Sequence, residues 1–520
     1  MEQFELIAKT FQGLEEVLAQ ELIELGANDV QIARRAVSFT GDQKMMYRAN
    51  FCLRTAIRIL KPIRQFTAHD ADEVYDAVRK INWMDYLDLD TTFAVDSVVY
   101  SDDFRHSKFV AYKVKDAIVD YFRDTTGQRP NIRITNPDIR LNIHIADTKC
   151  TLSLDSSGES LHLRGYRTAS VAAPLNEVLA AGLIKLSGWD FQSDFIDPFC
   201  GSGTLLVEAA LMARNIHPGI FRKQFGFEKW KDFNKDLLDE IYNDDSEERP
   251  FPHHLYGYDL NIHAVEAATA NAKAAGVADL VTIRQQDIRK FEQPAEPAII
   301  ITNPPYGERL TGPEIPATYH ALGERLKKAF AGGEAWVISS KYELFDEIGM
   351  KASTRIPLVN GSIDCELRKY VIFNGSMRDF RAAGGEVKTA EDRRNNLTKR
   401  KNGMRREADE HRHRRDDLDP EEMQYEILRS KHQEFERHRE IQHRKMQAAN
   451  YSREYHGERD NERGKFRSNS RFGHDDRRRE GNRNEERHFR RDEHPYSRNG
   501  FRKSGDRKDY RGGKQGFRKD

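Results

Sequence analysis

Hydrophobic residues in the first part of the chain follow the periods of a strand, a helix and a second strand. Residues 4–8 are strand-like, and residues 13–25 carry apolar side chains at helical spacing. Gly26 stands where such a helix would end, and residues 37–39 have the pattern of a returning strand. The pattern predicts a small α+β unit over residues 1–53.

Strand and helix patterns alternate again over residues 54–157. The expected helices are 74–81 and 108–122, and the expected strands are 93–100, 138–145 and 150–155. Basic or polar stretches lie between them at 101–108 and 129–133, and another follows at 161–167. We therefore expect a second α+β unit in this region.

A third region, residues 160–375, alternates short apolar runs with helical segments. The expected strands are 195–199, 255–259, 281–287, 298–305 and 334–340, and the expected helices are 204–214, 262–275, 319–330 and 342–348. Such alternation is typical of βαβ crossovers, which build a parallel sheet with helices on both faces. Residues 215–252 interrupt it as an insertion, and residues 364–373 are expected to add an edge strand. The predicted fold class is therefore α/β.

Apolar residues become sparse from Ser376 onward, where Arg, Asp, Glu, Asn, His and Gly dominate. This composition cannot bury enough apolar surface to offset the entropy of ordering, so residues 376–520 are expected to be largely disordered. Residues 420–447, rich in Glu, Arg, Lys and Gln, are a candidate for a solvated helix.

Charge is distributed unevenly, although the whole chain has a formal net charge of +0. From residue 376 onward, 41 Lys and Arg stand against 30 Asp and Glu, and before it 43 stand against 54. The tail is therefore basic and the body is mildly acidic. Net charge alone does not indicate a nucleic-acid partner, but its distribution permits one.

The four cysteines stand singly, at Cys52, Cys150, Cys200 and Cys365. No pair has the spacing of metal ligands, so neither a zinc site nor a disulfide framework is indicated. The first residues lack the basic and apolar segments of a secretory signal, and no apolar run reaches membrane-spanning length. We therefore expect a cytoplasmic protein with no bound metal and no membrane partner.

A glycine-rich turn, DPFCGSGT at residues 197–204, lies between an apolar strand and a helix. Such a turn lets the backbone approach a ligand at the carboxyl edge of a sheet. It lacks the lysine of a nucleoside-triphosphate loop and departs from the spacing of a dinucleotide loop. A tight turn that only packs the helix is the competing explanation.

Acidic residues end the next two predicted strands. Asp259 closes LYGYD, where nucleoside-binding α/β folds place a carboxylate on the ribose hydroxyls. Asp287 closes VTIRQQD, where a carboxylate could accept a hydrogen bond from an adenine amino group while Ile288 packs on the ring. Each has a simpler explanation, because Asp259 or Asn261 could cap the following helix and Asp287 could be a cap or turn residue.

The most specific motif is Asn303-Pro304-Pro305-Tyr306, which follows the apolar run IIIT. A strand that ends in this motif places a side-chain carbonyl, a backbone carbonyl and an aromatic ring together. The prolines fix the backbone and leave no donors, so the notch is rigid and rich in acceptors. It suits a planar base that carries an exocyclic amine. A proline-stiffened loop with an exposed Tyr306 is the alternative, but the motif falls at a strand end like the other three.

The four motifs follow successive predicted strands at their carboxyl ends, where ligands bind in open α/β sheets. In this order they resemble the class I methyltransferases that modify exocyclic amino groups. LHLRGYRTASVAAPLNEVLAAGLIKLSGW at residues 161–189 and the continuation DPFCGSGTLLVEAALMARNIHPG are similar to the THUMP-containing RNA guanine-N2 methyltransferases. The likeness is strongest to those acting on bacterial 23S ribosomal RNA. By position and length, residues 54–157 resemble their RNA-binding THUMP domain, and residues 1–53 resemble the ferredoxin-like piece beside it.

This resemblance implies a Rossmann-like, seven-stranded methyltransferase domain over residues 160–375, with S-adenosyl-L-methionine as the cofactor. The residues that it implies for cofactor binding are Asp197, Gly201, Gly203, Thr204, Asp259, Asp287, Asn176 and Glu177. The first four would line the methionine and ribose part, Asp259 would bind the ribose hydroxyls, and Asp287 would lie near the adenine. Asn176 and Glu177 would close over the methionine end.

The resemblance assigns the substrate side to the NPPY motif. Asn303 and Pro304 would accept hydrogen bonds from the guanine amine, and Tyr306 would stack on the base. RNA is the implied partner, with ribosomal RNA favoured over transfer RNA. The tail has no second glycine-rich loop, so the second methyltransferase domain of the enterobacterial relatives is not indicated.

Two other functions stay open on the sequence. An N6-adenine methyltransferase can share an NPPY-type motif, although a THUMP-like region points to RNA. A non-enzymatic RNA-binding or ribosome-assembly factor could keep the fold without the activity. The basic tail, in which Arg and Lys alternate with Tyr, Phe and Gly, would raise local affinity for RNA phosphates or could anneal RNA.

Overall fold

The computed structural model describes residues 2–104, 106–171, 173–294, 297–306, 314–330, 332–361, 363–373, 377–382 and 388. Of the tail that is expected to be disordered, only a short helix, α11 (Met377–Ala382), and residue 388 are described. The candidate helix at 420–447 lies wholly outside the described residues. Among the residues described, no helix combines the length and apolar character that crossing a bilayer requires.

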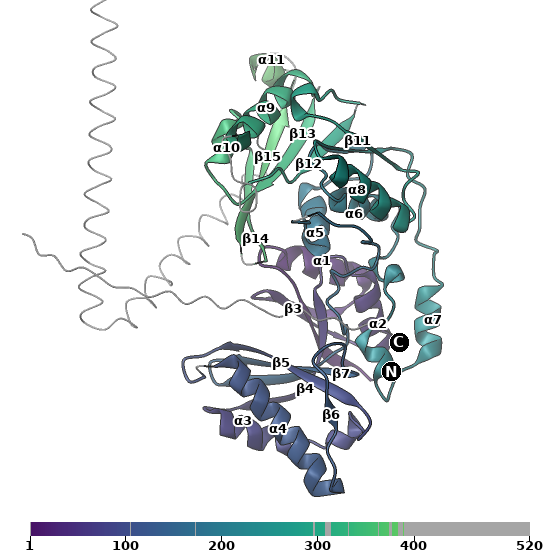
Figure 1. The fold of residues 1–520 in the computed structure, drawn as a ribbon, viewed down its shortest axis with the longest axis vertical. Helices are drawn as coiled ribbons and strands as arrows, with labels where there is room; N and C mark the ends of the chain where they lie inside the picture. Colours follow the sequence, from purple (N-terminus) through teal and green to yellow (C-terminus); the bar gives the residue numbers. More distant parts are fainter. Residues whose placement is uncertain are drawn as a thin grey trace, which may run out of the picture. The chain divides into compact units, whose positions relative to one another are not determined.

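One sheet of eight strands runs through both predicted N-terminal units, in the order β2-β3-β1-β4-β8-β7-β5-β6 (Figure 1). The strands are β1 (Phe4–Lys9), β2 (Asn28–Ala33), β3 (Ala36–Gly41), β4 (Arg58–Thr67), β5 (Thr92–Tyr100), β6 (Asn131–Ile132), β7 (Ile139–Ala146) and β8 (Lys149–Asp155). Strand β4 pairs with β1 through its first residues and with β8 along most of its length. It therefore joins the two units into one sheet.

The helices of this part begin and end at residues suited to capping. They are α1 (Glu15–Leu25), α2 (Gln43–Cys52), α3 (Ala71–Arg79), the 3-10 helix η1 (Trp83–Asp85) and α4 (Ser107–Thr126). Asp42 and Asp70 accept hydrogen bonds from backbone amides at the starts of α2 and α3. Gly26 ends α1 in the left-handed conformation, as the sequence predicted.

A second sheet has seven strands in the order β11-β10-β9-β12-β13-β15-β14 (Figure 1). The strands are β9 (Asp194–Asp197), β10 (Leu255–Asp259), β11 (Val281–Gln285), β12 (Ala298–Thr302), β13 (Gly333–Ser339), β14 (Thr354–Asn360) and β15 (Ile363–Ile372). Strands β9 to β13 are parallel, whereas β15 runs antiparallel to both β13 and β14. The predicted α/β class and the Rossmann-like sheet are confirmed.

Helices cover both faces of this sheet, so successive strand residues enter opposite cores. Phe195 and Ile299 share one core with α5 (Glu177–Ser187), α6 (Thr204–Ala213) and α8 (Ile262–Ala274). Ile196 and Ile300 share the other with α9 (Glu314–Lys328), α10 (Leu344–Glu347) and the 3-10 helix η4 (Ile288–Lys290). Burial on both faces explains why these strands are nearly continuous apolar runs.

The strand expected at residues 364–373 is present, but its expected position at the edge of the sheet is wrong. That segment forms most of β15, which lies between β13 and β14 and pairs with both. The true edge is β14, TRIPLVN, which the sequence pattern did not predict. Pro357 argues against a strand interior, but a proline is tolerated on an edge because one side of the strand needs no partner.

The insertion at residues 215–252 packs on the core of the N-terminal sheet. It contains η2 (Pro218–Phe221), η3 (Gly226–Lys229) and α7 (Lys235–Tyr242). Its residues in that core are Phe225, Phe227, Trp230, Leu238 and Ile241. The ring of Phe227 stacks on Tyr47 with 4.0 Å between centroids. The insertion thus ties the seven-stranded domain to the N-terminal part.

Candidate active site

The carboxyl ends of β9, β10 and β12 meet at one edge of the seven-stranded sheet, and hydrogen bonds link them. The Thr302 hydroxyl, at the end of β12, donates to Asp197 Oδ1 at the end of β9 over 2.6 Å. The backbone amide of Gly201 donates to Asp259 Oδ2 at the end of β10 over 3.0 Å. The glycine-rich turn therefore contacts Asp259 directly, and it contacts the residue that precedes the NPPY motif.

The glycine-rich turn needs its glycines for two reasons. Gly201 and Gly203 adopt φ values of +53° and +78°, which side chains disfavour. A Cβ at Gly203 would also lie 2.9 Å from Cβ of Ala268, on α8. By contrast, a Cβ at Gly201 would meet no described atom closer than Val171, at 4.0 Å. The turn is thus packed tightly against α8 at one glycine and open at the other.

Asp197 is almost fully buried beneath this turn. It accepts hydrogen bonds from Thr302 and from the backbone amide of Phe199, at 3.1 Å. Burial raises the pKa of its carboxyl to about 7, against the lowering effect of these hydrogen bonds, and the nearby charge of Asp259 raises it further. Asp197 is therefore held inside the site, where it shapes the turn.

Asp259 is half-buried and accepts from two backbone amides, those of Gly201 and of Asn261 at 2.8 Å. The cap of α8 is Asn261, whose side chain accepts from His263. The capping alternative for this region therefore belongs to Asn261, and Asp259 contacts the glycine-rich turn instead.

Asp287 lies two residues beyond the end of β11. Its side chain caps η4 by accepting from the Arg289 amide at 2.9 Å, and it pairs with the Arg289 guanidinium at 3.1 Å. Ile288, expected beside the adenine, is buried in the core that contains α9. A capping role accounts for the contacts of Asp287, and the adenine role remains a proposal.

The NPPY motif supplies a buried side-chain acceptor. Asn303 Oδ1 is buried and has no hydrogen-bond partner among the described residues. Pro304 beside it is buried, and the half-buried Tyr306 packs on the core that contains α9. The Tyr306 hydroxyl accepts from the side-chain amide of Asn360, at the end of β14, over 3.3 Å. The motif therefore presents an acceptor beside the glycine-rich turn.

Asn176 and Glu177 begin helix α5. Asn176 is its N-cap and accepts from the amides of Val178 and Leu179. Glu177 is buried, and its carboxylate pairs with Arg167 at 2.8 Å. In the described contacts, Glu177 reaches the glycine-rich turn through that arginine.

Two residues of this network were not among the predicted ones. Arg167 donates to Ser202 and Thr204 in the turn, each at 2.9 Å. Asn271, buried on α8, donates to the carbonyl of Ser202 at 2.9 Å and binds residues 168 and 169. The sequence marked residues 161–167 as a basic stretch and as part of the segment that carries the family resemblance, but it gave Arg167 no role. Asn271 lies within a helix pattern that carries no chemical signal.

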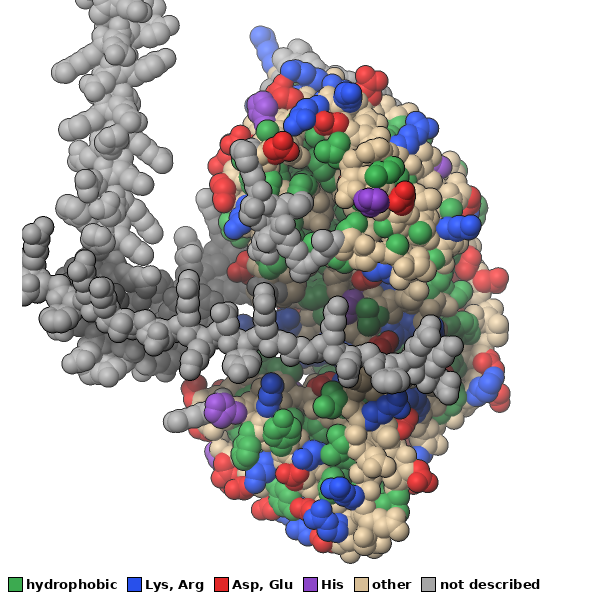
Figure 2. Space-filling model, in the orientation of Figure 1, with side chains coloured by type: hydrophobic (Ala, Val, Ile, Leu, Met, Phe, Trp, Pro, Cys, Tyr) green, Lys and Arg blue, Asp and Glu red, His purple; other side chains and the backbone are tan. Residues whose placement is uncertain are grey.

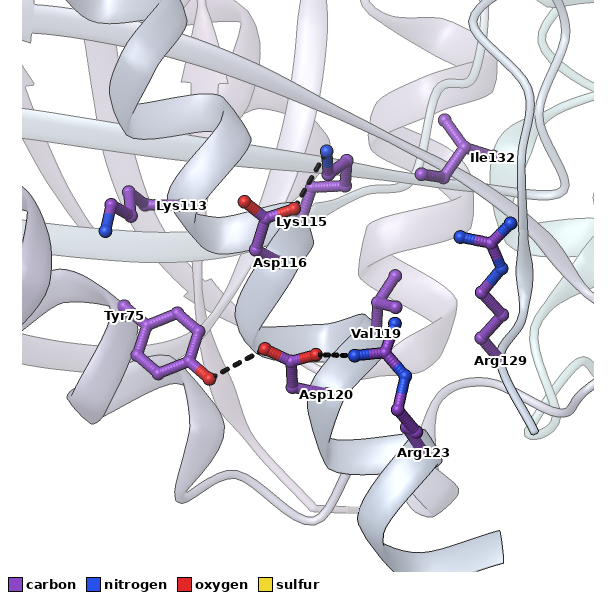
Figure 3. Close-up of a pocket in the computed structure, with 9 residues that line it drawn as sticks. All are labelled: Tyr75, Lys113, Lys115, Asp116, Val119, Asp120, Arg123, Arg129 and Ile132. Carbon is purple, nitrogen blue, oxygen red and sulfur yellow. Dashed lines mark hydrogen bonds and ion pairs between the residues drawn. The ribbon is translucent and has the colours of Figure 1, made fainter. Parts of the chain in front are cut away.

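A separate recess of about 430 Å³ lies in the N-terminal part, lined mainly by α4 (Figure 3). Lys115 and Arg123 each pair with a neighbouring aspartate, Asp116 at 2.8 Å and Asp120 at 2.7 Å. The Tyr75 hydroxyl also donates to Asp120. Lys, Arg, Asp and Glu side chains are interspersed over α3 and α4 (Figure 2). The lining thus carries four basic residues, two of them paired with its two aspartates, so the recess is mildly basic.

Three family models match the chain, one after another. They are the RlmL ferredoxin-like domain at residues 5–60, the THUMP domain at residues 68–155 and the RMKL-like methyltransferase domain at residues 164–369. The third range contains the whole edge described above.

Among curated proteins, the chain is 41% identical over 380 residues to the ribosomal RNA large subunit methyltransferase K/L of Photobacterium profundum. The match covers 72% of this chain and 53% of that protein. The chain therefore spans about half the length of this curated relative.

Three solved structures match this chain over nearly their whole length. SMU.472 complexed with SAH is 29% identical, with a TM-score of 0.63, over 72% of this chain and 100% of that chain. A Clostridium difficile 630 protein described as a possible methylase is 30% identical, with a TM-score of 0.65, over 71% and 98%. A Listeria monocytogenes str. 4b F2365 protein described as a predicted N6-adenine-specific DNA methylase is 32% identical, with a TM-score of 0.63, over 71% and 96%.

Proposed function

The chain belongs to the family of THUMP-domain proteins with an RMKL-like methyltransferase domain, and on that basis we propose that it methylates RNA with S-adenosyl-L-methionine. The proposed acceptor is the exocyclic N2 of a guanine, and the proposed substrate is 23S ribosomal RNA. The substrate class draws on the Photobacterium relative, whose name places it on the large-subunit RNA.

The observation that carries the activity is the buried Asn303 Oδ1, which has no hydrogen-bond partner in the part of the chain that the structure describes. A buried carbonyl oxygen without a hydrogen bond costs on the order of 1–3 kcal/mol. Such a cost is tolerated at a site where a ligand supplies the missing donor. An exocyclic amine has two N–H donors, which suits Asn303 Oδ1 together with the Pro304 carbonyl.

The residues beside Asn303 fit an adenosyl cofactor. Each Asp259 oxygen accepts one backbone amide, and a carboxylate oxygen can accept a second hydrogen bond from a ribose hydroxyl. The open side of Gly201 leaves the backbone approachable. In SMU.472, a similar chain, SAH is bound. This donor and acceptor set supports S-adenosylmethionine as the cofactor.

When bound, the cofactor supplies an electrophilic methyl group on a sulfonium sulfur. Asn303 and Pro304 would hold the amine in line with that group, which lowers the entropic part of the barrier. Their oxygens would also stabilise the positive charge that develops on nitrogen as the nitrogen–carbon bond forms and the carbon–sulfur bond breaks. The nitrogen then loses its proton to water, and the transfer requires no strong base. Since a paired base is inaccessible, the target guanine must lie outside a helix.

Substitution of Asn303 by alanine tests this assignment. We expect N303A to lower the methylation rate by at least about 100-fold, as loss of a preorganised polar group does elsewhere. Its dissociation constant for S-adenosylmethionine, measured by calorimetry, should stay within about twofold. Asn243→Ala, on the exposed surface of the insertion, is the matched control and should keep full activity. Loss of cofactor binding by N303A, or full activity, would contradict the role.

The N6-adenine alternative has a specific observation in its favour, the description of the Listeria relative as a predicted N6-adenine-specific DNA methylase. Nucleoside mass spectrometry separates the candidates when ribosomal RNA, transfer RNA and DNA from a deletion strain are compared with wild type. Loss of N2-methylguanine from 23S ribosomal RNA is the expected result. Loss from transfer RNA, loss of N6-methyladenine from DNA, or no loss would each point to another function.

A further inference from the structure

The segment Arg164–Ala169, which we call the strap, contacts both the N-terminal part and the glycine-rich turn. At its start, the Arg164 guanidinium donates to the carbonyls of Leu161 at 2.8 Å and Arg54 at 2.5 Å. Tyr166 donates to the buried Glu208 of α6 at 2.8 Å. At its end, the amides of residues 168 and 169 donate to Asn271. The strap is therefore fixed at both ends and in the middle.

Arg167 lies between these anchor points, and its guanidinium joins three segments. Its Nε donates to Glu177 Oε1 on α5 at 2.8 Å, and its Nη2 donates to the Leu175 carbonyl at 3.1 Å. The remaining contacts are to the turn: Nη1 to Ser202 Oγ and Nη2 to Thr204 Oγ1, each at 2.9 Å. The fork of one arginine therefore holds both residues that flank Gly203.

The turn requires such support because of its glycines. Gly201 and Gly203 have access to more backbone conformations than other residues, so the turn is not fixed by its own backbone. The bond from Gly201 to Asp259 holds one side of it. Arg167 holds the other side through the two hydroxyls, and Asn271 holds the Ser202 carbonyl at 2.9 Å. Of these supports, Arg167 makes the largest number of hydrogen bonds. Among the described contacts of the turn, it is also the only charged donor, and its charge is paired with the buried carboxylate of Glu177.

We propose that Arg167 is a positioning residue that holds the glycine-rich turn in its cofactor-binding conformation. The inference rests on the proposed function, since it concerns affinity for S-adenosylmethionine. It adds a residue that acts on the cofactor through Ser202 and Thr204. A lysine cannot replace it, because an ammonium lacks the planar fork that reaches several acceptors at once.

The test compares Arg167→Gln and Arg167→Lys with Arg249→Gln. Arg249 is the matched control because its guanidinium binds the carbonyls of Ala213 and Met212 at the opposite end of α6. Hydrogen exchange of the amides at residues 201–205 is measured in the free full-length protein. Titration calorimetry then gives the dissociation constant for S-adenosylmethionine, and kinetics give kcat and the KM for each substrate.

We expect R167Q to speed exchange at residues 201–205 and to weaken S-adenosylmethionine binding by about 10-fold or more. The KM for the cofactor should rise while the KM for RNA and kcat at saturation change little. R167K should recover only a small part of the affinity. R249Q should lower Tm without changing turn exchange or cofactor affinity, because it acts on the other end of the helix.

Equal effects of R167Q and R249Q on affinity, or affinity within twofold of wild type in R167Q, would overturn the proposal. Full rescue by lysine would also overturn it. If R167Q does not fold, Ser202→Ala removes one bond of the fork and should still speed exchange in the turn. If the wild-type chain does not bind S-adenosylmethionine, the proposed function is refuted. Hydrogen exchange at residues 201–205 in the free protein still tests whether Arg167 holds the turn, because it needs no cofactor.

Discussion

Asp197 and Asp259 place two carboxyl groups at the ends of adjacent strands, but in different surroundings. Asp197 is buried under the turn, and Asp259 is half-buried and receives two backbone amides. The first is therefore a structural element of the turn, and the second is the better candidate for a ribose contact. The role of Asp197 can be tested through the stability of the protein, and the role of Asp259 through its affinity for the cofactor.

The stability of the protein should depend on the ionisation of Asp197. Its pKa is raised to about 7 in the folded chain, whereas an unfolded aspartate titrates near about 3.9. The folded state therefore binds the proton more tightly, and the stability that this provides below pH 4 is lost as pH rises toward 7. The unfolding free energy of D197N minus that of wild type should therefore increase by about 2–3 kcal/mol from pH 5 to pH 8.

Urea denaturation of wild type and D197N at several pH values measures this difference. Other buried carboxyls, such as Asp155 and Glu208, also have raised pKa values because of their burial. They are present in both proteins, so the comparison isolates Asp197. The exposed Asp245→Asn is the control and should shift stability equally at every pH. A constant difference between D197N and wild type would contradict the assignment.

Replacement of Asp259 by alanine should weaken S-adenosylmethionine binding by about 10- to 100-fold, since a charged hydrogen bond contributes about 1.5–3 kcal/mol. Asn261→Ala is the control two residues away. It removes the N-cap of α8, which should cost about 1 kcal/mol of stability and leave affinity unchanged. Calorimetry on both variants is the measurement. Wild-type affinity in D259A would exclude a ribose contact.

Part of the site could be predicted because parallel strands bring their carboxyl ends together. The hydrophobic pattern shows which residues end each strand, so Asp197, Asp259 and Asn303 could be grouped from the sequence alone. Arg167 and Asn271 could not, because they reach the turn from a loop and from the middle of a helix. Their role depends on tertiary contacts that leave no periodic pattern.

At the level of elements, two of the strands that the sequence did not predict, β4 and β14, each contain a proline. Strand β4 contains Pro62, yet it lies inside the eight-stranded sheet. The sheet accommodates the proline beside an irregularity in register between Pro62 and Arg64. Strand β14 contains Pro357 and lies at an edge. In both cases the tertiary arrangement outweighs local propensity, which periodicity alone cannot show.

The insertion gives a prediction at the same level. Phe227 is fully buried between Tyr47, at 4.0 Å, and Phe225, at 5.3 Å between ring centroids. Phe227→Ala should destabilise the N-terminal part by about 3–5 kcal/mol, because it removes a large buried ring and leaves a cavity. Denaturant unfolding measures the lost stability, and hydrogen exchange shows whether the loss lies in the N-terminal part.

The exposed Ile220, in the same insertion, provides the control. Ile220→Ala should change stability by less than about 0.5 kcal/mol. The affinity of F227A for S-adenosylmethionine should remain close to wild type below its unfolding transition, since the ring belongs to the core of the N-terminal sheet and not to either core of the seven-stranded domain. A large loss of cofactor affinity would show that the insertion also supports the active site.

For the whole molecule, the separation of charge is the feature that most affects RNA binding. The body carries an excess of acidic residues and the tail an excess of basic ones. The recess on α4 is only mildly basic, because two of its four basic side chains are paired with its two aspartates. Affinity for RNA phosphates should therefore depend on the basic residues of the tail more than on the body.

A chain that ends at Ala390 tests this idea, because it keeps every described residue and removes most of the tail. Each lysine or arginine that contacts a phosphate releases a counterion, so log Kd for RNA should vary less steeply with log salt after truncation. We expect weaker RNA binding at low salt, a shallower salt dependence, and an unchanged dissociation constant for S-adenosylmethionine. Filter binding at several salt concentrations and calorimetry measure these quantities. The same salt slope in both chains would instead place the phosphate contacts on the body, where the THUMP domain would have to supply them.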